Sequence, residues 1–187
     1  MKLILPAKIK GSVRAPASKS LSIRALLAAA LAPGVSTISN LSNCDDLQSC
    51  ENALSAMHVK TWEVPHALCV QGGTISLPSQ IKCGESALLL RMLISITALF
   101  LNEGIELIGQ GSLRRRPLGD LSQLKKLGIE ITDQLEGTPI QIKGRLCPGQ
   151  IELDASHTSQ ILSGLLFALP LLPSSSEIRV STLKSSP

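Results

Sequence analysis

A short run of polar side chains stands directly before an apolar segment near the start of the chain. The run is Ser18-Lys19-Ser20, and Arg24 follows four residues after Ser20. Residues 18–32 are predicted to form a helix, so the run lies at a helix N-terminus, where free backbone N–H groups and the helix dipole attract anions. Residues four apart share one helix face. The spacing favours a site for phosphate or carboxylate, although a plain helix cap with solvated charges fits the run equally well.

The composition of the 187-residue chain restricts its partners. Eighteen basic and 14 acidic residues leave a net charge of only +4, and aromatic residues make up 2%. Such a chain offers neither a strongly basic surface nor aromatic platforms for stacking bases, so we expect no nucleic-acid partner. A hydrophobic fraction of 44% and a mean hydropathy of +0.27 predict one sizeable domain of layered α/β structure, with helices enclosed on several sides.

The cysteines and the apolar runs argue against a metal site, a secretory signal and a membrane span. Five cysteines are scattered without a CxxC pair or a histidine at a spacing suited to zinc, which predicts reduced thiols and no metal. The apolar run from Leu88 to Leu101 contains Arg91 and is shorter than the roughly 20 residues of a membrane span. Residues 1–6 carry too short an apolar run for a signal peptide. We therefore expect a cytoplasmic protein without membrane contact.

One order of elements repeats along the chain with a period of roughly 65 to 70 residues. The first copy predicts a helix over 18–32, a strand over 35–40, a helix over 45–57 and strands over 59–64 and 67–70. The second copy predicts a helix over 86–101, a strand over 105–108, a helix over 117–127 and strands over 129–132 and 139–142. The third copy predicts a strand over 150–153, a helix over 157–169 and a strand over 177–181. We therefore predict three repeats, about 18–75, 80–145 and 150–187, the last of them truncated.

Each repeat opens its first helix with polar residues. These openings are Ser18-Lys19-Ser20, Gly84-Glu85-Ser86 and His157-Thr158-Ser159-Gln160. If the repeats pack with quasi-threefold symmetry, the three helix starts converge on one end of the domain. Convergence would create a single anion site.

Four segments of the chain resemble motifs of the enolpyruvyl transferase family. They are Ser18-Lys19-Ser20-x-x-x-Arg24, Gly109-x-x-Ser112-Leu113-x-x-Arg116-Pro117-Leu118, Asp154-x-Ser156-x-x-Ser159-Gln160 and Leu183-Lys184-Ser185-Ser186-Pro187. Their order and spacing are similar to those of the family, over the whole chain. The resemblance implies an α/β (α+β) fold with two similar domains of three βαβαββ units each and an active site between them. It further implies that this chain is the N-terminal part, with 18–187 in a substrate-binding domain and 1–17 associated with the other, absent domain.

The resemblance is to the branch of the family that acts on shikimate 3-phosphate. It implies transfer of the enolpyruvyl group from phosphoenolpyruvate to the 5-hydroxyl of that substrate, in the shikimate pathway to aromatic amino acids, without metal or organic cofactor. The partners would be these two small molecules and the second domain of the same enzyme. Because the family's acidic proton-transfer residues lie in its second half, we expect this chain alone to bind shikimate 3-phosphate without turning it over.

The resemblance also implies roles for residues near the first helix and the arginine run. Lys19 would be catalytic and would contact phosphoenolpyruvate and the reacting hydroxyl. Ser20 and Arg24 would hold the shikimate carboxylate, with the guanidinium as a planar fork. Arg115 or Arg114 would bind phosphoenolpyruvate, and the arginine that follows them would be structural.

Further binding roles fall at the start of the third repeat's helix and near the end of the chain. Thr158, Ser159 and Ser185 would bind the phosphate of shikimate 3-phosphate through short hydroxyl donors. Gln160 would contact both substrates. A plain helix cap is the alternative for the residues at the helix start.

The segment from Cys83 to Arg91 departs from the corresponding family pattern, which usually reads Gly-Asn-x-Gly-Thr-x-x-Arg. Here Glu85, Ala87 and Leu88 replace Asn, Gly and Thr. A Cβ at Ala87 stands where the backbone normally approaches phosphoenolpyruvate. The departure therefore predicts a changed affinity for that substrate and a changed response to inhibitors.

Other functions stay open at this point. A sister branch of the family, which acts on UDP-N-acetylglucosamine, typically has Lys-Asn after its first strand and a cysteine before Arg-Pro. This chain has Lys19-Ser20 instead, and no cysteine between Gly109 and Pro117. The chain could also be a non-catalytic anion-binding module, or a domain kept only for interactions. Binding of shikimate 3-phosphate separates these functions.

Overall fold

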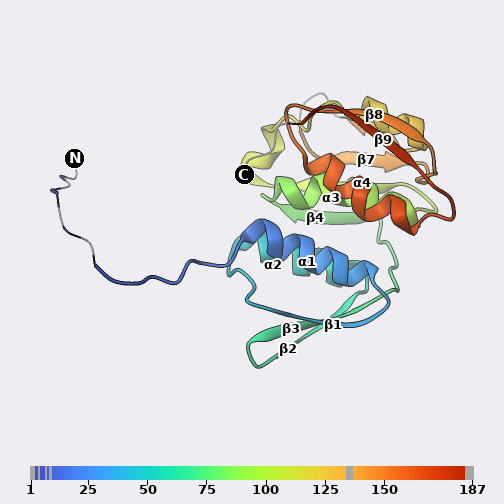
Figure 1. Cartoon of the computed structure of the whole chain (residues 1–187). Coiled ribbons are helices and arrows are strands. Elements are labelled where there is room, and N and C mark those ends of the chain that lie inside the picture. The colour runs from blue at the N-terminus through green and yellow to red at the C-terminus, as the bar shows by residue number, and fades with distance from the viewer. Residues whose placement is uncertain (1–2, 4, 7, 9, 134–136, 184–187) are drawn as a thin grey trace.

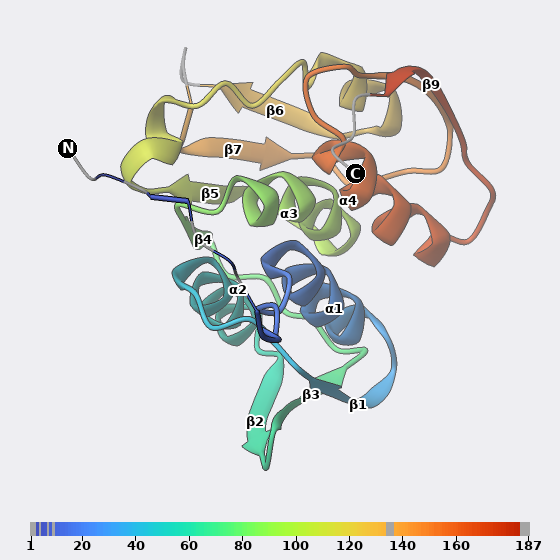
Figure 2. The same ribbon diagram turned by 60° about the vertical axis from the view of Figure 1, so that its left-hand side comes forward.

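The computed structural model describes residues 3, 5–6, 8, 10–133 and 137–183. The α-helices are α1 (Lys19–Leu31), α2 (Asp45–Ala56), α3 (Ala87–Phe100) and α4 (Gln160–Ala168), and the short 3₁₀ helices are η1 (Gly111–Arg115), η2 (Ser122–Leu127) and η3 (Leu169–Leu171). Figures 1 and 2 show the α-helices toward the middle of the molecule, with most strands outside them and one strand, β4, between α2 and α3. Mixed helices and strands confirm the predicted α/β (α+β) class.

The strands form three separate sheets. The first contains β1 (Gly34–Ser39), β2 (Lys60–Val64) and β3 (Ala67–Gly72) in the order β1-β3-β2. The second contains β4 (Gln80–Gly84), β5 (Ile105–Gly109), β6 (Glu130–Asp133) and β7 (Ile140–Lys143) in the order β4-β5-β7-β6. The third pairs β8 (Gln150–Ala155) with β9 (Glu177–Leu183).

The pairing of strands repeats along the chain. In the first sheet β3 pairs antiparallel with both β1 and β2, and in the second sheet β7 pairs antiparallel with both β5 and β6. The second and third sheets each contain a parallel pair, β4 with β5 and β8 with β9, and both pairs shift register near their ends. The sheets are therefore variants of one unit, as the periodic order of elements predicts.

Helix α3 lies at the centre of the hydrophobic core. Eleven of its 14 residues are buried, so the helix is enclosed on nearly every side, which confirms the prediction from the hydropathy. It packs closely on α4 at Gly164, where an added Cβ would lie 3.0 Å from the Cα and carbonyl oxygen of Met92. Because α3 and α4 are the first helices of successive repeats, this contact fixes one repeat relative to the other.

The predicted helix over 117–127 is wrong. Residues 117–121 form no helix, and only the 3₁₀ turn η2 follows. Gly119 has φ +94°, and the side chain of Arg91 donates to the carbonyl oxygens of Pro117 and Leu118. The contact with Arg91 thus occupies the carbonyl oxygens that would accept backbone hydrogen bonds in the first turn of a helix.

Two further differences from the prediction concern the start of a helix and an additional strand. The helix predicted over 157–169 begins only at Gln160, because Ser156 and Thr158 make local hydrogen bonds that hold the preceding residues in a turn. Strand β4 was not predicted, although its residues alternate between exposed and buried, with Ile81 and Cys83 facing inward, because a run of five residues is a short signal.

The N-terminal segment takes a separate course. Residues 10–17 form neither helix nor strand, and Figure 1 shows the chain before α1 leading away from the body of the molecule. A membrane crossing would need a longer apolar helix than any that the described residues form.

Candidate functional site

The start of α1 places a lysine beside an aspartate of α2. Ser18 caps α1, its Oγ accepting from the backbone N–H of Leu21 at 3.4 Å. Nζ of Lys19 lies 3.0 Å from Oδ2 of Asp46, in the first turn of α2, and 52% of the lysine side chain is exposed. The ammonium therefore has one carboxylate partner and a solvent-facing side open to an anion.

Arg24 connects α1 to α4. Its Nη1 donates to the carbonyl oxygen of Ser20 at 3.2 Å, and its Nη2 donates to Oγ of Ser163 at 3.2 Å. These two bonds hold the guanidinium between the first and third repeats. The predicted sharing of one helix face by Ser20 and Arg24 is thus observed directly.

Arg91 connects α3 to α4 in the same way. Its Nη1 donates to Oε1 of Gln160 at 2.7 Å, while its other nitrogens donate to the carbonyl oxygens of Pro117 and Leu118 at 2.8 and 3.2 Å. Burial and the charge of Arg116 lower the pKa of Arg91 from its ordinary value. A guanidinium stays positively charged in proteins. Gln160 is therefore held in place by a charged donor.

The start of α4 presents its hydroxyl groups from a half-buried turn. Oγ1 of Thr158 accepts from the backbone N–H of Gln160 at 3.2 Å, and the carbonyl oxygen of Ser159 accepts from Oγ of Ser163 at 3.2 Å. An added Cβ on Gly119 would lie 3.8 Å from Cγ2 of Thr158, so the turn faces the segment that Arg91 holds. Of the predicted phosphate-binding residues, Ser185 lies outside the described residues.

The arginine run lies on η1, beside the start of α3. Arg114 and Arg115 belong to η1 and are exposed. Oε2 of Glu85, which directly precedes the cap residue Ser86 of α3, accepts from both the backbone N–H and Oγ of Ser112, at 2.9 and 2.7 Å. These bonds connect the arginine-bearing turn to the second repeat's helix start.

Charges of both signs meet where α1, α2 and α3 begin. The bonds from Ser112, reinforced by the charge of Arg116, lower the pKa of Glu85, and the charge of Asp46 acts in the opposite direction. Gly84 lies against Ser49 of α2, which brings β4 and the start of α3 next to α2. The region therefore contains Lys19, the carboxylates of Asp46 and Glu85, and Arg116.

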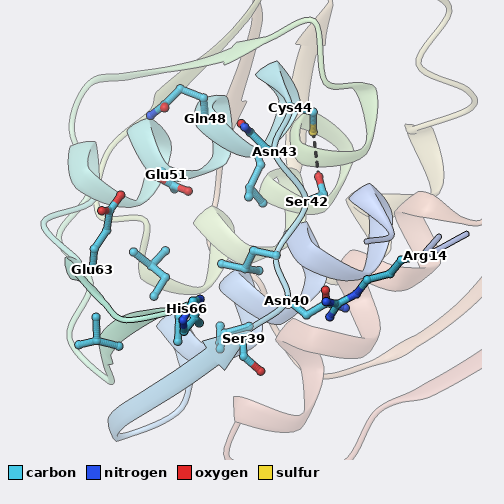
Figure 3. A pocket seen from close by; sticks show the side chains of 16 residues that line it. Arg14, Ser39, Asn40, Ser42, Asn43, Cys44, Gln48, Glu51, Glu63 and His66 are labelled. Atoms are coloured by element: carbon cyan, nitrogen blue, oxygen red, sulfur yellow. Dashed lines mark hydrogen bonds between the residues drawn. The ribbon is translucent and has the colours of Figure 1, made fainter. Parts of the chain in front are cut away.

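Two neighbouring cavities adjoin the start of α1. The smaller, of about 480 Å³, is lined by Lys19, by residues 14–17 and by the loop of residues 40–44. The larger, of about 850 Å³, shares Arg14 and that loop and extends between α2 and the β2–β3 hairpin. Figure 3 shows Arg14 at one end of the larger cavity and Glu63 at the other. Of these two cavities, the larger thus lies next to the predicted residues rather than among them, and only the smaller one contains a predicted residue, Lys19.

In the described parts of the chain, no three His, Cys, Asp or Glu side chains gather in a way that could hold a metal ion. Cysteines 50 and 83 are buried and only Cys147 is exposed, and no disulfide joins the five cysteines.

Several residues of the site were missed from the sequence. Arg91 was noted as an interruption of an apolar run and as the last residue of the segment compared with the family pattern, without a role in the site, and Asp46 was given no role in the site either. A lone arginine inside an otherwise apolar helix was the available signal, because a buried guanidinium must find acceptors. For Ser163, no comparable signal exists, since its partner is 139 residues away.

Comparison with known proteins gives a consistent result. The family model described as EPSP synthase (3-phosphoshikimate 1-carboxyvinyltransferase) matches residues 5–187. A 3-phosphoshikimate 1-carboxyvinyltransferase of Clostridium botulinum is 36% identical over 96% of this chain, and one of Salmonella schwarzengrund is 35% identical over 93%. The chain spans about 43% of the length of each of these relatives.

A solved structure shares the fold. EPSP synthase from Acinetobacter baumannii superposes with a TM-score of 0.79 at 20% identity, covering 94% of this chain and 42% of that one. At this identity the match shows the architecture alone. It agrees with the repeated strand pairing described above.

Proposed function

This chain belongs to the EPSP synthase family, and from this premise we propose that it carries the shikimate 3-phosphate subsite and part of the phosphoenolpyruvate subsite of an enolpyruvyl transferase. The whole protein would act in the shikimate pathway. It would convert shikimate 3-phosphate and phosphoenolpyruvate to 5-enolpyruvylshikimate 3-phosphate and phosphate. Sequence relatives named 3-phosphoshikimate 1-carboxyvinyltransferase support this reaction.

The proposed reaction is an addition followed by an elimination. C3 of phosphoenolpyruvate takes a proton while the 5-hydroxyl oxygen of shikimate 3-phosphate attacks C2 and loses its own proton. The tetrahedral intermediate then loses phosphate from C2 and a proton from C3, which restores the double bond. Orientation, charge stabilisation and proton transfer are sufficient for such chemistry.

The carboxylate and the phosphate of shikimate 3-phosphate would bind to adjacent helix starts. Ser20 and Arg24 would hold the carboxylate, and Thr158, Ser159 and the C-terminal Ser185 would hold the phosphate. The bond from Arg24 to Ser163 supports this assignment, because it places the guanidinium one helical turn from Ser159.

Phosphoenolpyruvate would lie toward the start of α3. Lys19 would contact it and the reacting hydroxyl, exchanging part of its interaction with Asp46 for the substrate anion. Arg115 or Arg114 would add a second cation from η1, and Gln160 would contact both substrates. Proton transfer and the remaining cations would come from the second domain, so we expect the 187-residue chain alone not to turn over.

A single observation carries the proposal. Two side-chain hydrogen bonds, Arg24 to Ser163 and Arg91 to Gln160, tie α4 to α1 and to α3. The first helices of three repeats are thereby held together near residues to which the family resemblance gives substrate roles. Separate helices with independent caps would not need these bonds.

Calorimetry with shikimate 3-phosphate tests the proposal. The wild-type chain should release or absorb heat, and Arg24→Ala should lose the signal at the same ligand concentration, while Lys60→Ala on the outer strand β2 should retain it. Absence of binding by the wild-type chain would refute the proposed subsite. Binding of UDP-N-acetylglucosamine in place of shikimate 3-phosphate would instead identify the sister activity.

A further inference from the structure

We propose that Glu85 is a positioning residue, which fixes the arginine-bearing turn η1 beside the start of α3 and so determines the affinity for phosphoenolpyruvate. This inference rests on the proposed function, because it assigns that substrate to the arginines of η1. It concerns a position at which the chain departs from the family pattern, with Glu in place of Asn.

The carboxylate makes two hydrogen bonds with one residue of η1. Oε2 accepts from the backbone N–H and from the hydroxyl of Ser112, at 2.9 and 2.7 Å. Such charge-assisted bonds are short and about twice as strong as neutral ones. The bond to the backbone N–H fixes the main chain of the turn, not only a side chain.

Gly111, which precedes Ser112, leaves room for the carboxylate of Glu85. Gly111 has φ +50°, and an added Cβ there would collide with the carboxyl group of Glu85. On the other side of the turn, Gly137 lies against the carbonyl group of Arg114. The arginine-bearing turn is thus held between the carboxylate and a hairpin, with the arginines on its exposed surface.

Two effects of Glu85 on a bound anion oppose each other. Its negative charge repels a phosphate, whereas its bonds to Ser112 hold the cations that attract one. The carboxylate is fully exposed, so water and salt screen the repulsion, and Arg116 lies close enough to offset part of it. Water and salt do not in the same way cancel the effect of the two hydrogen bonds on the position of η1. Positioning therefore dominates, and loss of the carboxylate should weaken binding.

Three variants separate the two effects. Glu85→Ala removes both the charge and the bonds, whereas Glu85→Gln keeps an oxygen acceptor at the same place and removes only the charge. Glu177→Ala is the matched control, because Glu177 is also an exposed carboxylate with two side-chain partners, Gln150 and Arg179. It pairs with the first residue of β8, a full strand away from the start of α4.

The measurement is a titration of the isotope-labelled 187-residue chain with phosphoenolpyruvate at saturating shikimate 3-phosphate, followed by the amide signals of residues 112–116. Glu85→Ala should weaken phosphoenolpyruvate binding about tenfold, which is the effect of losing one well-placed bond to a charged group. Glu85→Gln should stay within about threefold of wild type, and Glu177→Ala should equal it. Affinity for shikimate 3-phosphate, read at Thr158 and Ser159, should change in none of them.

Other outcomes overturn the inference in distinguishable ways. If both Glu85 variants bind phosphoenolpyruvate more tightly than wild type, the residue acts as a repelling charge and not as a support. If the wild-type signals of residues 112–116 do not respond to phosphoenolpyruvate while those of Thr158 respond to shikimate 3-phosphate, the inference fails alone. If neither ligand has an effect, the proposed function fails with it.

Discussion

Arg91 and Gln160 are joined across two repeats by a hydrogen bond of 2.7 Å, although 69 residues separate them in the sequence. The same guanidinium also binds the carbonyl groups of Pro117 and Leu118. One side chain of α3 thus supports the start of α4 and the segment after the arginine run. The start of α4 carries residues to which we assign substrate contacts, and the segment of Pro117 and Leu118 follows the arginines of η1, so Arg91 supports the site without itself being one of the predicted ligands.

Replacement of Arg91 should destabilise the fold. In Arg91→Leu three acceptors lose their donor in a partly buried place, and we expect the free energy of unfolding to fall by about 2 kcal/mol. Urea denaturation measures the change. The control is Arg179→Leu, which removes an exposed arginine from β9 and should shift stability by no more than about 0.5 kcal/mol. Equal effects of the two substitutions would contradict the role given to Arg91.

Lys19 should matter for binding and hardly for stability. Its ion pair with Asp46 is largely exposed, and such pairs contribute roughly 0 to 1 kcal/mol. Lys19→Ala should therefore leave the urea midpoint nearly unchanged while it weakens phosphoenolpyruvate binding at least tenfold. A large loss of stability without loss of binding would show that the lysine is structural.

Acid should loosen η1 through Glu85. Its pKa is lowered in the folded chain, so the bonds to Ser112 stabilise the fold fully above the ordinary glutamate pKa, near 4.5, and this contribution is lost as the pH falls through the lower folded value. An NMR titration should give a Glu85 midpoint below that ordinary value, with the amide signal of Ser112 moving in parallel. In Glu85→Gln the Ser112 signal should no longer titrate in this range.

Close packing at Gly164 predicts a strong effect of a single methyl group. In Gly164→Ala the new Cβ would press on Met92 of α3, and we expect a loss of about 1 to 3 kcal/mol in thermal or urea unfolding. Gly104→Ala is the matched control, because its Cβ would make only ordinary contacts, at 3.5 Å. Unchanged stability in Gly164→Ala would mean that α3 and α4 are not packed as described.

The cysteines should react in the order of their exposure. Cys147 is exposed, whereas burial raises the pKa of the Cys83 thiol to about 12 and raises that of Cys50 as well. Since the thiolate is the reactive form, a thiol reagent at neutral pH should modify Cys147 first, and Cys50 and Cys83 only after unfolding. Mass spectrometry of partly modified protein checks the order; early modification of Cys83 would refute it.

The elements followed from the sequence wherever local signals were strong. The helices that became α1, α2 and α3 were predicted to within about two residues at their ends, because caps such as Ser18 and Ser86 and continuous apolar stretches act over a few neighbouring residues. The repeat was also visible, since each copy must bury a similar face. The closeness of Ser20 and Arg24 on one face of α1 followed from the 3.6-residue period.

The sequence by itself thus determined the class, the repeated order of elements and the polar openings of three helices. Tertiary structure alone decided that residues 117–121 are not helical, that Arg91 holds Gln160, and that Glu85 binds the turn with the arginines. The physical reason is the distance along the chain over which each kind of interaction acts. Backbone preferences and amphipathic periods act within one or two turns of chain, whereas a hydrogen bond between residues 27 or 69 positions apart forms only after packing has brought its donor and acceptor together.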